Sequence, residues 1–335
     1  MERRNVDSLI KEIRDCVDRH NLGTPGAYCR YTAGPKAEER VNNEYGVADA
    51  ANILYSINDF QQAQEDRDHW IKVLRDMQDP ETGMYQEPTH HTVHTTAHCL
   101  AALELFDAKA LHKCTYLNDY RTKEGLYNLL ENGIRWKTDP WRDSHLGAGV
   151  FVALTMTDAV DAQWKDWYFD WFWEHTNPDH GCPFLGDEMT APLHHVMGGG
   201  FHYYFNHEAE HRPMRYPEAV IDFCTPWFWK PREYMEGKVF LNHTGFIEVD
   251  LVYSVTRAMR QTPYKFYETK EALEHFADKF LDMMFALDFQ NNPGFNDLHS
   301  LFGSVCCLAE LQQALPGKII TSKPLRLVLD RRPFI

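Results

Sequence analysis

Residues 77–106 read MQDPETGMYQEPTHHTVHTTAHCLAALELF, and this stretch decides the predicted fold. Its first residues end an amphipathic helix predicted over 60–78, in which apolar positions recur every three or four residues with charges between them. The segment DPETGMY then supplies the Pro and Gly signals of a turn. Residues 91–106 are small and apolar and contain no Lys or Arg, a pattern typical of a buried helix.

The same alternation of half-exposed and buried helices runs through the whole chain. Buried helices recur about every 50 residues, which is typical of a repeat architecture. Half-exposed helices are predicted over 6–20, 60–78, 122–135, 160–174, 214–230 and 268–287, and buried helices over 44–57, 91–106, 143–158, 192–207, 244–260 and 296–314.

Six half-exposed helices alternating with six buried ones predict an all-α fold. We expect an (α/α)6 toroid of six helix hairpins that spans residues 1–335 as one domain, and a two-layer helical solenoid is the alternative. The tail over 317–335 contains β-branched residues and Pro, so we expect it to run extended across the outside. The long polar connections lead into the buried helices, which predicts the functional site where those helices begin.

The stretch 77–106 resembles one repeat of the six-hairpin toroid superfamily. It is similar to the repeats of terpene cyclases and prenyltransferases, and to those of toroidal glycosidases, polysaccharide lyases and sugar epimerases. The terpenoid branch fits poorly, because the chain has no DxDD or DDxxD motif and carries Tyr85 where a QxxxGxW repeat has Trp. The sugar-acting toroids resemble the chain more, since they carry acids, histidines and aromatics at the starts of their inner helices. This resemblance implies a carbohydrate-active enzyme.

Composition narrows the partners and the compartment. The net charge of -15 disfavours nucleic acid and anionic membranes as main partners, since both are polyanions. The first residues lack the apolar core of a signal peptide, no apolar run is long enough to span a bilayer, and the eight cysteines are scattered. We therefore expect a cytoplasmic protein with reduced thiols and no cofactor, whose partner is a small saccharide. A homo-oligomer is compatible with the sequence.

Acidic residues at the starts of the buried helices are the predicted catalytic groups. Glycosidic cleavage needs an acid and a second carboxylate on opposite faces of the bond. Asp143 and Asp297 are the first choices for the general acid, Glu248 and Asp250 are candidate companions, and Asp49 is a further candidate. The alternative is that first-turn acids only cap the helices or interact with their dipoles.

Histidines and aromatic residues concentrate near the same helix starts. Histidine transfers protons near neutral pH and binds hydroxyl groups, and aromatic rings stack on sugars. The predicted substrate-binding residues are Tyr45, Tyr85, His91, His94, His98, Trp141, His145, His195 and His299. The leading hypothesis is a glycoside hydrolase acting on a small and sometimes acidic saccharide. The alternatives are a sugar lyase or epimerase with His and Tyr bases, and a non-catalytic binding scaffold.

One motif suggests metal chemistry. His207, Glu208 and His211 match the HExxH pattern, in which two histidines bind zinc and the glutamate is the base. Arg212 and Pro213 follow at once and end the helix, and the motif falls at the end away from the predicted site, so the leading expectation is no metal. The run of three glycines at 198–200 follows no strand, which favours close helix packing or room for a ligand over a phosphate loop.

Overall fold

The computed structural model describes residues 3–34, 40–60, 63–183, 189–230 and 245–335. Helices dominate these residues, and their only sheet is one short parallel pair, β1 (Arg4–Asn5) with β2 (Ile319–Ile320). The predicted all-α class is therefore confirmed. The predicted helices are present, with ends that differ from the prediction by a few residues.

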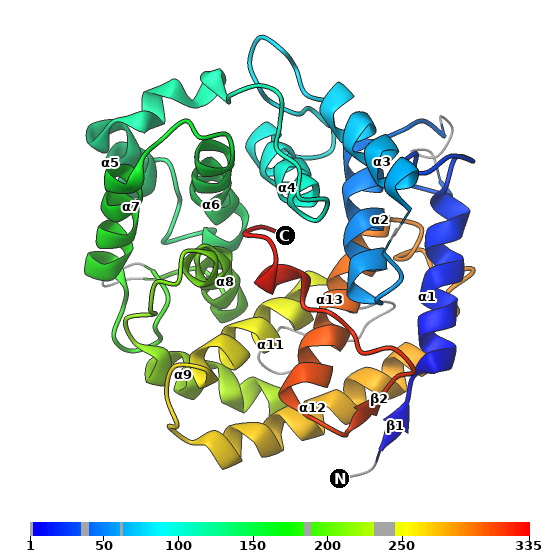
Figure 1. The fold of residues 1–335 in the computed structure, drawn as a ribbon. Helices are drawn as coiled ribbons and strands as arrows, with labels where there is room; N and C mark the ends of the chain where they lie inside the picture. Colours follow the sequence, from blue (N-terminus) through cyan, green and yellow to red (C-terminus); the bar gives the residue numbers. More distant parts are fainter. Residues whose placement is uncertain (1–2, 35–39, 61–62, 184–188, 231–244) are drawn as a thin grey trace.

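Helices that are buried nearly all round occupy the inside of the molecule (Figure 1). In the first of them every residue from Tyr45 to Ser56 is buried. Each inner helix contacts the next inner helix along the chain, and the last contacts the first, so the contacts return to their start. The inner helices are α2 (Glu44–Ser56), α4 (Thr92–Glu104), α6 (Pro140–Met156), α8 (Leu193–Ala209), α11 (Phe246–Met259) and α13 (Leu298–Ala314).

A second set of helices lies around the inner helices, and each precedes one of them in the chain (Figure 1). These outer helices bury one face only. In α1 the buried residues Leu9, Ile13 and Val17 are four apart and so share one face. The outer helices are α1 (Asp7–His20), α3 (Gln64–Asp76), α5 (Lys123–Asn132), α7 (Ala162–His175), α9 (Pro217–Trp229) and α12 (Phe266–Ala286), with the short helix η2 (Thr115–Arg121) before α5.

Caps and close approaches fix where the inner helices begin. The Asn43 side chain accepts hydrogen bonds from the backbone N–H groups of Tyr45 and Gly46, which starts α2. A Cβ at Gly46 would lie 2.5 Å from the Tyr28 carbonyl oxygen, so only glycine fits there. These contacts hold the first turn of α2 in one position against the loop before it.

The C-terminal segment departs from the prediction. After β2 the chain crosses to the short helix η3 (Val328–Asp330) and ends among the inner helices (Figure 1). Phe334 is 0% exposed and Ile335 is 2% exposed. The prediction that the tail runs across the outside is therefore wrong for its last eight residues, because their apolar side chains complete the core between the inner helices.

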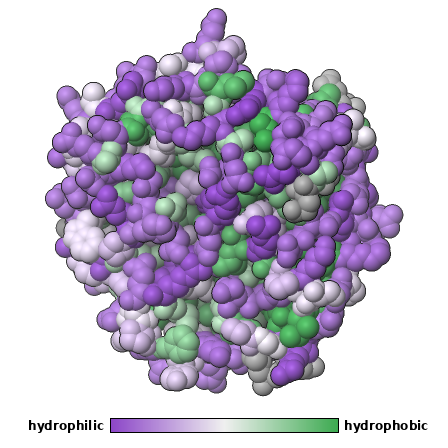
Figure 2. Space-filling view, viewed as in Figure 1, coloured by the Kyte–Doolittle hydropathy of each residue, from purple (hydrophilic) through white to green (hydrophobic). Residues whose placement is uncertain are grey.

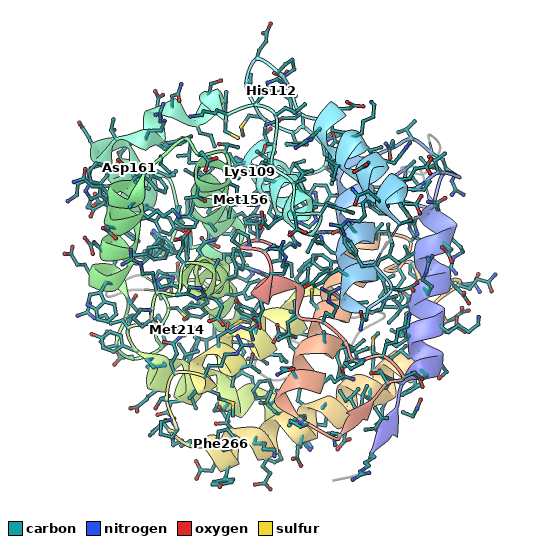
Figure 3. All side chains as sticks on the ribbon, in the orientation of Figure 1. Lys109, His112, Met156, Asp161, Met214 and Phe266 are labelled. Atoms are coloured by element: carbon teal, nitrogen blue, oxygen red, sulfur yellow. The ribbon has the colours of Figure 1, made fainter. Side chains whose placement is uncertain are left out.

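Figures 1, 2 and 3 show the molecule from the side on which the C-terminal ends of the inner helices lie. Figure 3 labels Met156, which ends α6, and Lys109 and Met214, which follow α4 and α8. This face is largely hydrophilic, with hydrophobic residues visible between the polar ones (Figure 2). None of the described helices combines the length and the apolar composition that crossing a bilayer requires.

Candidate active site

A cavity of about 140 Å³ lies at the opposite end, where the inner helices begin. Five of the residues that line it are histidines, and they come from α4, α6, α8, α13 and the loop before α4. The lining residues are His90, His94, Trp141, His145, His202, Phe246, His299 and Ile335. The cavity therefore lies at the end of the fold where the site was predicted.

His94 and His202 are each held by a hydrogen bond from a hydroxyl group, and His145 lies between them. The Tyr45 hydroxyl is 2.5 Å from His94 Nδ1, and the Ser144 hydroxyl is 2.6 Å from His202 Nδ1. The His145 ring centroid lies 4.5 Å from that of His94 and 4.1 Å from that of His202. Since no described residue hydrogen-bonds to the His145 ring nitrogens, these nitrogens can bind a ligand.

Burial lowers the pKa of several histidines in the cavity wall. Burial lowers the pKa of His145 to about 3, and repulsion from His90 and His299 adds to the effect. Burial also lowers the pKa of His94 and of His202 well below the ordinary value. A neutral imidazole has one donor and one acceptor nitrogen. Among the described residues no Lys, Arg, Asp or Glu lines the cavity, so the site suits a ligand with hydroxyl groups.

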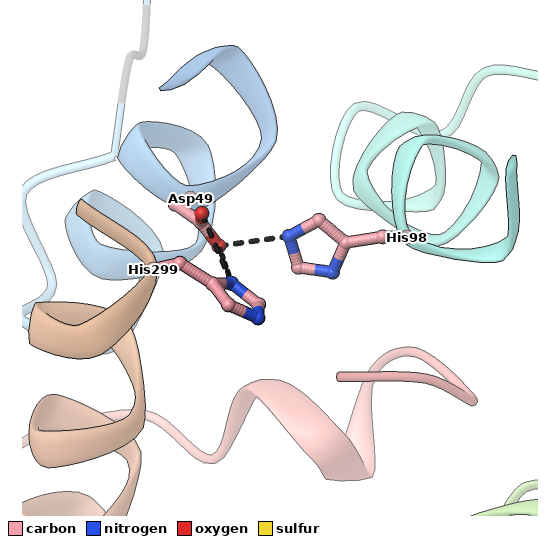
Figure 4. A group of neighbouring side chains, drawn as sticks. All are labelled: Asp49, His98 and His299. Atoms are coloured by element: carbon pink, nitrogen blue, oxygen red, sulfur yellow. Dashed lines mark hydrogen bonds and ion pairs between the residues drawn. The ribbon is translucent and has the colours of Figure 1, made fainter. Parts of the chain in front are cut away.

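Asp49 lies behind this wall, between two histidines from other helices (Figure 4). His98 Nε2 is 2.8 Å from Asp49 Oδ1, and His299 Nδ1 is 3.2 Å from both carboxylate oxygens. The other ring nitrogen of His299 points away from Asp49 (Figure 4). Asp49 therefore orients His299, whose ring also lines the cavity.

The charge state of this group follows from its contacts. Burial alone would raise the pKa of Asp49, but His299 and then His98 outweigh burial and hold that pKa below its ordinary value. Burial lowers the pKa of His98 to about 3, against the opposing effect of Asp49. An ionised carboxylate thus contacts a neutral imidazole. One ligand atom from each of Asp49, His98 and His299 lies within 4.8 Å of the others, so these side chains could hold a metal ion.

Asp297 is held by a buried arginine and does not line the cavity. Arg30 donates from Nε to Asp297 Oδ1 at 2.8 Å and from Nη2 to Oδ2 at 2.9 Å, and it also lies 2.8 Å from His90 Nδ1. Asp297 caps α13 by accepting a hydrogen bond from the His299 backbone N–H. Both oxygens of the Asp297 carboxylate are thus occupied by Arg30, and Asp297 fixes the start of α13 and the position of Arg30.

Asp143 is also paired with an arginine. Arg135 donates from Nε at 2.6 Å and from Nη2 at 2.8 Å. Burial raises the pKa of Asp143, but the hydrogen bonds from Arg135 lower it more, so it lies below its ordinary value. Asp143 lies outside the cavity lining. The geometry therefore disfavours the general-acid role predicted for Asp143.

Asp250, unlike Asp143, is buried without an ion-pair partner among the described residues. It is 1% exposed, and among the described residues neither carboxyl oxygen has a hydrogen-bond partner. Burial raises the pKa of Asp250 well above its ordinary value, Trp141 partly offsets this effect, and Glu248 adds to it. Asp250 lies one helical turn after Phe246, on the same face of α11. A raised pKa favours the protonated form that a proton donor needs, so Asp250 is the better candidate by its pKa, and like Asp143 it lies outside the cavity lining.

The remaining predicted residues have other roles. The Glu248 carboxylate accepts a hydrogen bond from the Gly245 backbone N–H and caps α11. Tyr85 is buried in the hydrophobic core, and the His91 ring caps α4. The His195 ring lies 5.5 Å from that of Trp141, with Nδ1 3.2 Å from Asp139 Oδ1, beside the cavity but outside its lining.

The HExxH residues do not form a zinc site in this structure. His207 lies in the last turn of α8 and bonds the Tyr203 carbonyl oxygen, whereas His211 follows the helix at φ 53°. Glu208 pairs with Arg260. The two histidines therefore do not share one helical face, because the helix ends between them.

Four lining residues were missing from the predicted set: His90, His202, Phe246 and Ile335. A signal existed for His202, which shares a face of α8 with Gly198, four residues earlier. A Cβ at Gly198 would lie 2.4 Å from Trp141 Cδ1, so the glycine run marks the close approach of α6 and α8 beside the cavity. No pattern marked Ile335, because the tail has no helical period.

No protein-family model, curated protein or solved structure matches the chain. Its function is therefore inferred from the geometry of the cavity.

Proposed function

We propose that the chain is a carbohydrate-active enzyme of the (α/α)6 toroid class that moves a proton at the carbon next to the carbonyl group of a small neutral saccharide, as sugar epimerases do. The closed series of contacts between the inner helices supports the toroid. One observation carries the function: five histidines from separate elements converge on a cavity whose described wall contains no Lys, Arg, Asp or Glu. Burial lowers the pKa of His94, His145 and His202, which favours neutral imidazoles that match sugar hydroxyls, since both kinds of group donate and accept hydrogen bonds.

The size of the cavity and its aromatic residues favour a single sugar ring. Its volume of about 140 Å³ is small beside the roughly 300–1,000 Å³ of pockets for drug-sized ligands. Trp141 and Phe246 offer apolar surfaces to the sugar ring. His145, whose ring nitrogens have no described partner, is the proposed proton carrier. The absence of a cation from the described wall favours a neutral sugar over an acidic one.

A cytoplasmic location belongs to the same proposal. All eight cysteines are free and buried. Free thiols persist in a reducing compartment, whereas secreted proteins commonly pair them.

Deuterium incorporation tests the proposed reaction. The protein is incubated in D2O with neutral mono- and disaccharides, and NMR follows the carbon-bound protons. We expect deuterium at a sugar carbon, and its loss in His145→Gln, because glutamine hydrogen-bonds but does not accept and release a proton near neutral pH. His69→Gln, an exposed position on α3, is the control that should keep the activity. Absence of exchange with every sugar, in protein shown to be folded, contradicts the proposal.

Glycoside hydrolysis is the second candidate, and one observation favours it. The pKa of Asp250 is raised by burial while that of Asp49 is held below its ordinary value, and such a split between two carboxyl groups is typical of acid and base pairs in glycosidases. Hydrolysis would release new reducing ends without deuterium at carbon. Asp250→Asn would then abolish the release, because the amide cannot protonate the leaving oxygen.

A further inference from the structure

Asp49, His98 and His299 form a group that the proposed proton transfer does not fully use. Three inner helices, α2, α4 and α13, each contribute one of them. The two imidazoles are the only hydrogen-bond partners of the Asp49 carboxylate among the described residues. The second nitrogen of His98, Nδ1, is buried and has no partner in the same part of the chain.

The spacing of the ligand atoms suits a metal ion. Zinc binds histidine nitrogen and carboxylate oxygen at about 2.0–2.2 Å, which places two ligands of a tetrahedral site about 3.4 Å apart. The nitrogens of His98 and His299 lie 2.8 and 3.2 Å from Asp49 Oδ1, and all the ligand atoms lie within 4.8 Å of one another. An ion between them would require only small movements of the side chains.

The buried charge of Asp49 also favours a cation. Asp49 is 0% exposed, and a buried carboxylate is costly without a charged partner. Burial lowers the pKa of Arg332, and Asp49 is one of the groups that partly offset this effect. However, no ion pair or hydrogen bond joins these two side chains within the described residues. A cation would therefore contact the Asp49 carboxylate directly only at the position between the imidazoles of His98 and His299.

The donor set indicates the kind of ion. Ca²⁺ and Mg²⁺ prefer several oxygen ligands, and this group offers one carboxylate. Imidazole nitrogen suits zinc, iron, copper and nickel, and two histidines with one carboxylate leave a position for water or substrate. His299 lines the cavity as well as facing Asp49, so that position would face the substrate.

We propose that Asp49, His98 and His299 bind one divalent transition-metal ion of the zinc type, with its open position toward the histidine-lined cavity. The site goes beyond the proposed function and does not depend on the identity of the substrate. An ion there would polarise a sugar oxygen or a water molecule.

Metal analysis of the purified full chain tests the site. After removal of metal with a chelator, the protein is titrated with Zn²⁺ and separately with Co²⁺. We expect one equivalent of zinc, a melting temperature that rises when zinc is restored, and a visible Co²⁺ spectrum of four or five ligands. Failure of the wild-type protein to bind either ion overturns the proposal, whatever the variants do.

Variants then assign the ligands. His98→Gln, His299→Gln and Asp49→Asn should each weaken zinc binding by ~100-fold or more, because each removes one of three ligands. His202→Gln is the matched control, since His202 lines the cavity without facing Asp49. If the ligand variants bind zinc as the control does, the site lies elsewhere and the proposal is wrong.

The two proposals fail separately. A protein that binds zinc with this dependence but exchanges no deuterium keeps the metal site and loses the proton-transfer function. If the protein still exchanges deuterium after complete removal of metal, the proton-transfer proposal stands without the metal. The zinc titration then decides by itself whether Asp49, His98 and His299 bind an ion.

Discussion

The two ends of the inner helices satisfy their buried polar groups in different ways. Where the helices finish, Arg257 is 0% exposed and donates to Glu310 at 2.7 and 2.8 Å and to Asp330 at 2.7 Å. Where the helices begin, polar groups lack partners among the described residues, including both carboxyl oxygens of Asp250 and Nδ1 of His98. A buried polar group without a partner costs about 1–3 kcal/mol. Buried ion pairs therefore stabilise the end where the helices finish, and the end where they begin contains the carboxyl group of Asp250 and a ring nitrogen of His98 without such pairs.

The C-terminal segment connects the two ends. Asp330 in η3 pairs with Arg257 and Arg260, and Arg331 pairs with Glu104 at the end of α4. Four residues after Asp330, Phe334 packs against Phe205 and His94, and Ile335 lines the cavity. The ion pairs of Asp330 and Arg331 therefore fix the chain segment whose last residues, Phe334 and Ile335, lie against the histidines of the cavity.

Breaking the ion-paired end should have the largest effect. Arg257→Ala leaves Glu310, which is 3% exposed, without its partner, so we expect a loss of about 3–5 kcal/mol in the free energy of unfolding. Urea denaturation measures it. Lys72→Ala is the control, since Lys72 and Asp76 form an exposed pair worth at most about 0.5 kcal/mol. Equal losses in the two variants would show that the buried cluster has no special role.

Phe334→Ala tests the connection between the ends, with the next largest effect. Its ring is 0% exposed and lies 5.5 Å from the Phe205 ring and 5.0 Å from the His94 ring, so truncation should cost about 3–4 kcal/mol. Phe266→Ala, which removes a ring that is 43% exposed, should cost far less. Thermal unfolding compares them. A Phe334 variant as stable as the wild type would mean that the tail does not complete the core.

Some of this arrangement could be predicted from sequence, and some could not. The helices followed from the alternation of half-exposed and buried segments, because burial on one face or on all faces leaves a clear pattern. Asp49 and His299 were placed near one cavity because both lie close to helix starts. The choice between Asp143 and Asp250 was out of reach, since it depends on the contact of Asp143 with Arg135 and on the neighbours that surround Asp250 in the folded chain. The tail has no periodicity, so its burial left no signal.

The two acids differ in the sign of their pH dependence. Because burial raises the pKa of Asp250, the folded protein takes up a proton as it forms, and its stability falls as pH rises from the ordinary carboxyl range to that raised pKa. Asp250→Asn removes this effect. Relative to the wild type, the variant should gain stability with rising pH by up to about 1.4 kcal/mol per pH unit, and gain nothing at acid pH.

Asp143→Asn is the matched comparison with the opposite sign. The pKa of Asp143 is lowered by Arg135, so its contribution is present above the ordinary carboxyl pKa and is lost as pH falls through the folded-state value. The variant should therefore be less stable than the wild type near neutral pH and equal to it in acid. Urea denaturation over a range of pH measures both variants. If the stability of the two variants relative to the wild type changes with pH in the same direction, the opposite pKa shifts of Asp250 and Asp143 are wrong.

Tyr45→Phe should have the smallest effect, and it tests how firmly the histidine end is held. Tyr45 is 0% exposed, and its hydroxyl group contacts His94 Nδ1, which has no other described hydrogen-bond partner. Losing the hydroxyl should cost about 1 kcal/mol, because the ring keeps its packing while one hydrogen bond disappears. Tyr55→Phe is the control, since no described residue hydrogen-bonds to that hydroxyl, and its stability should stay near that of the wild type. If Tyr45→Phe loses no more stability than Tyr55→Phe, the hydrogen bond from Tyr45 does not hold the His94 ring. Packing alone would then position that ring in the cavity wall.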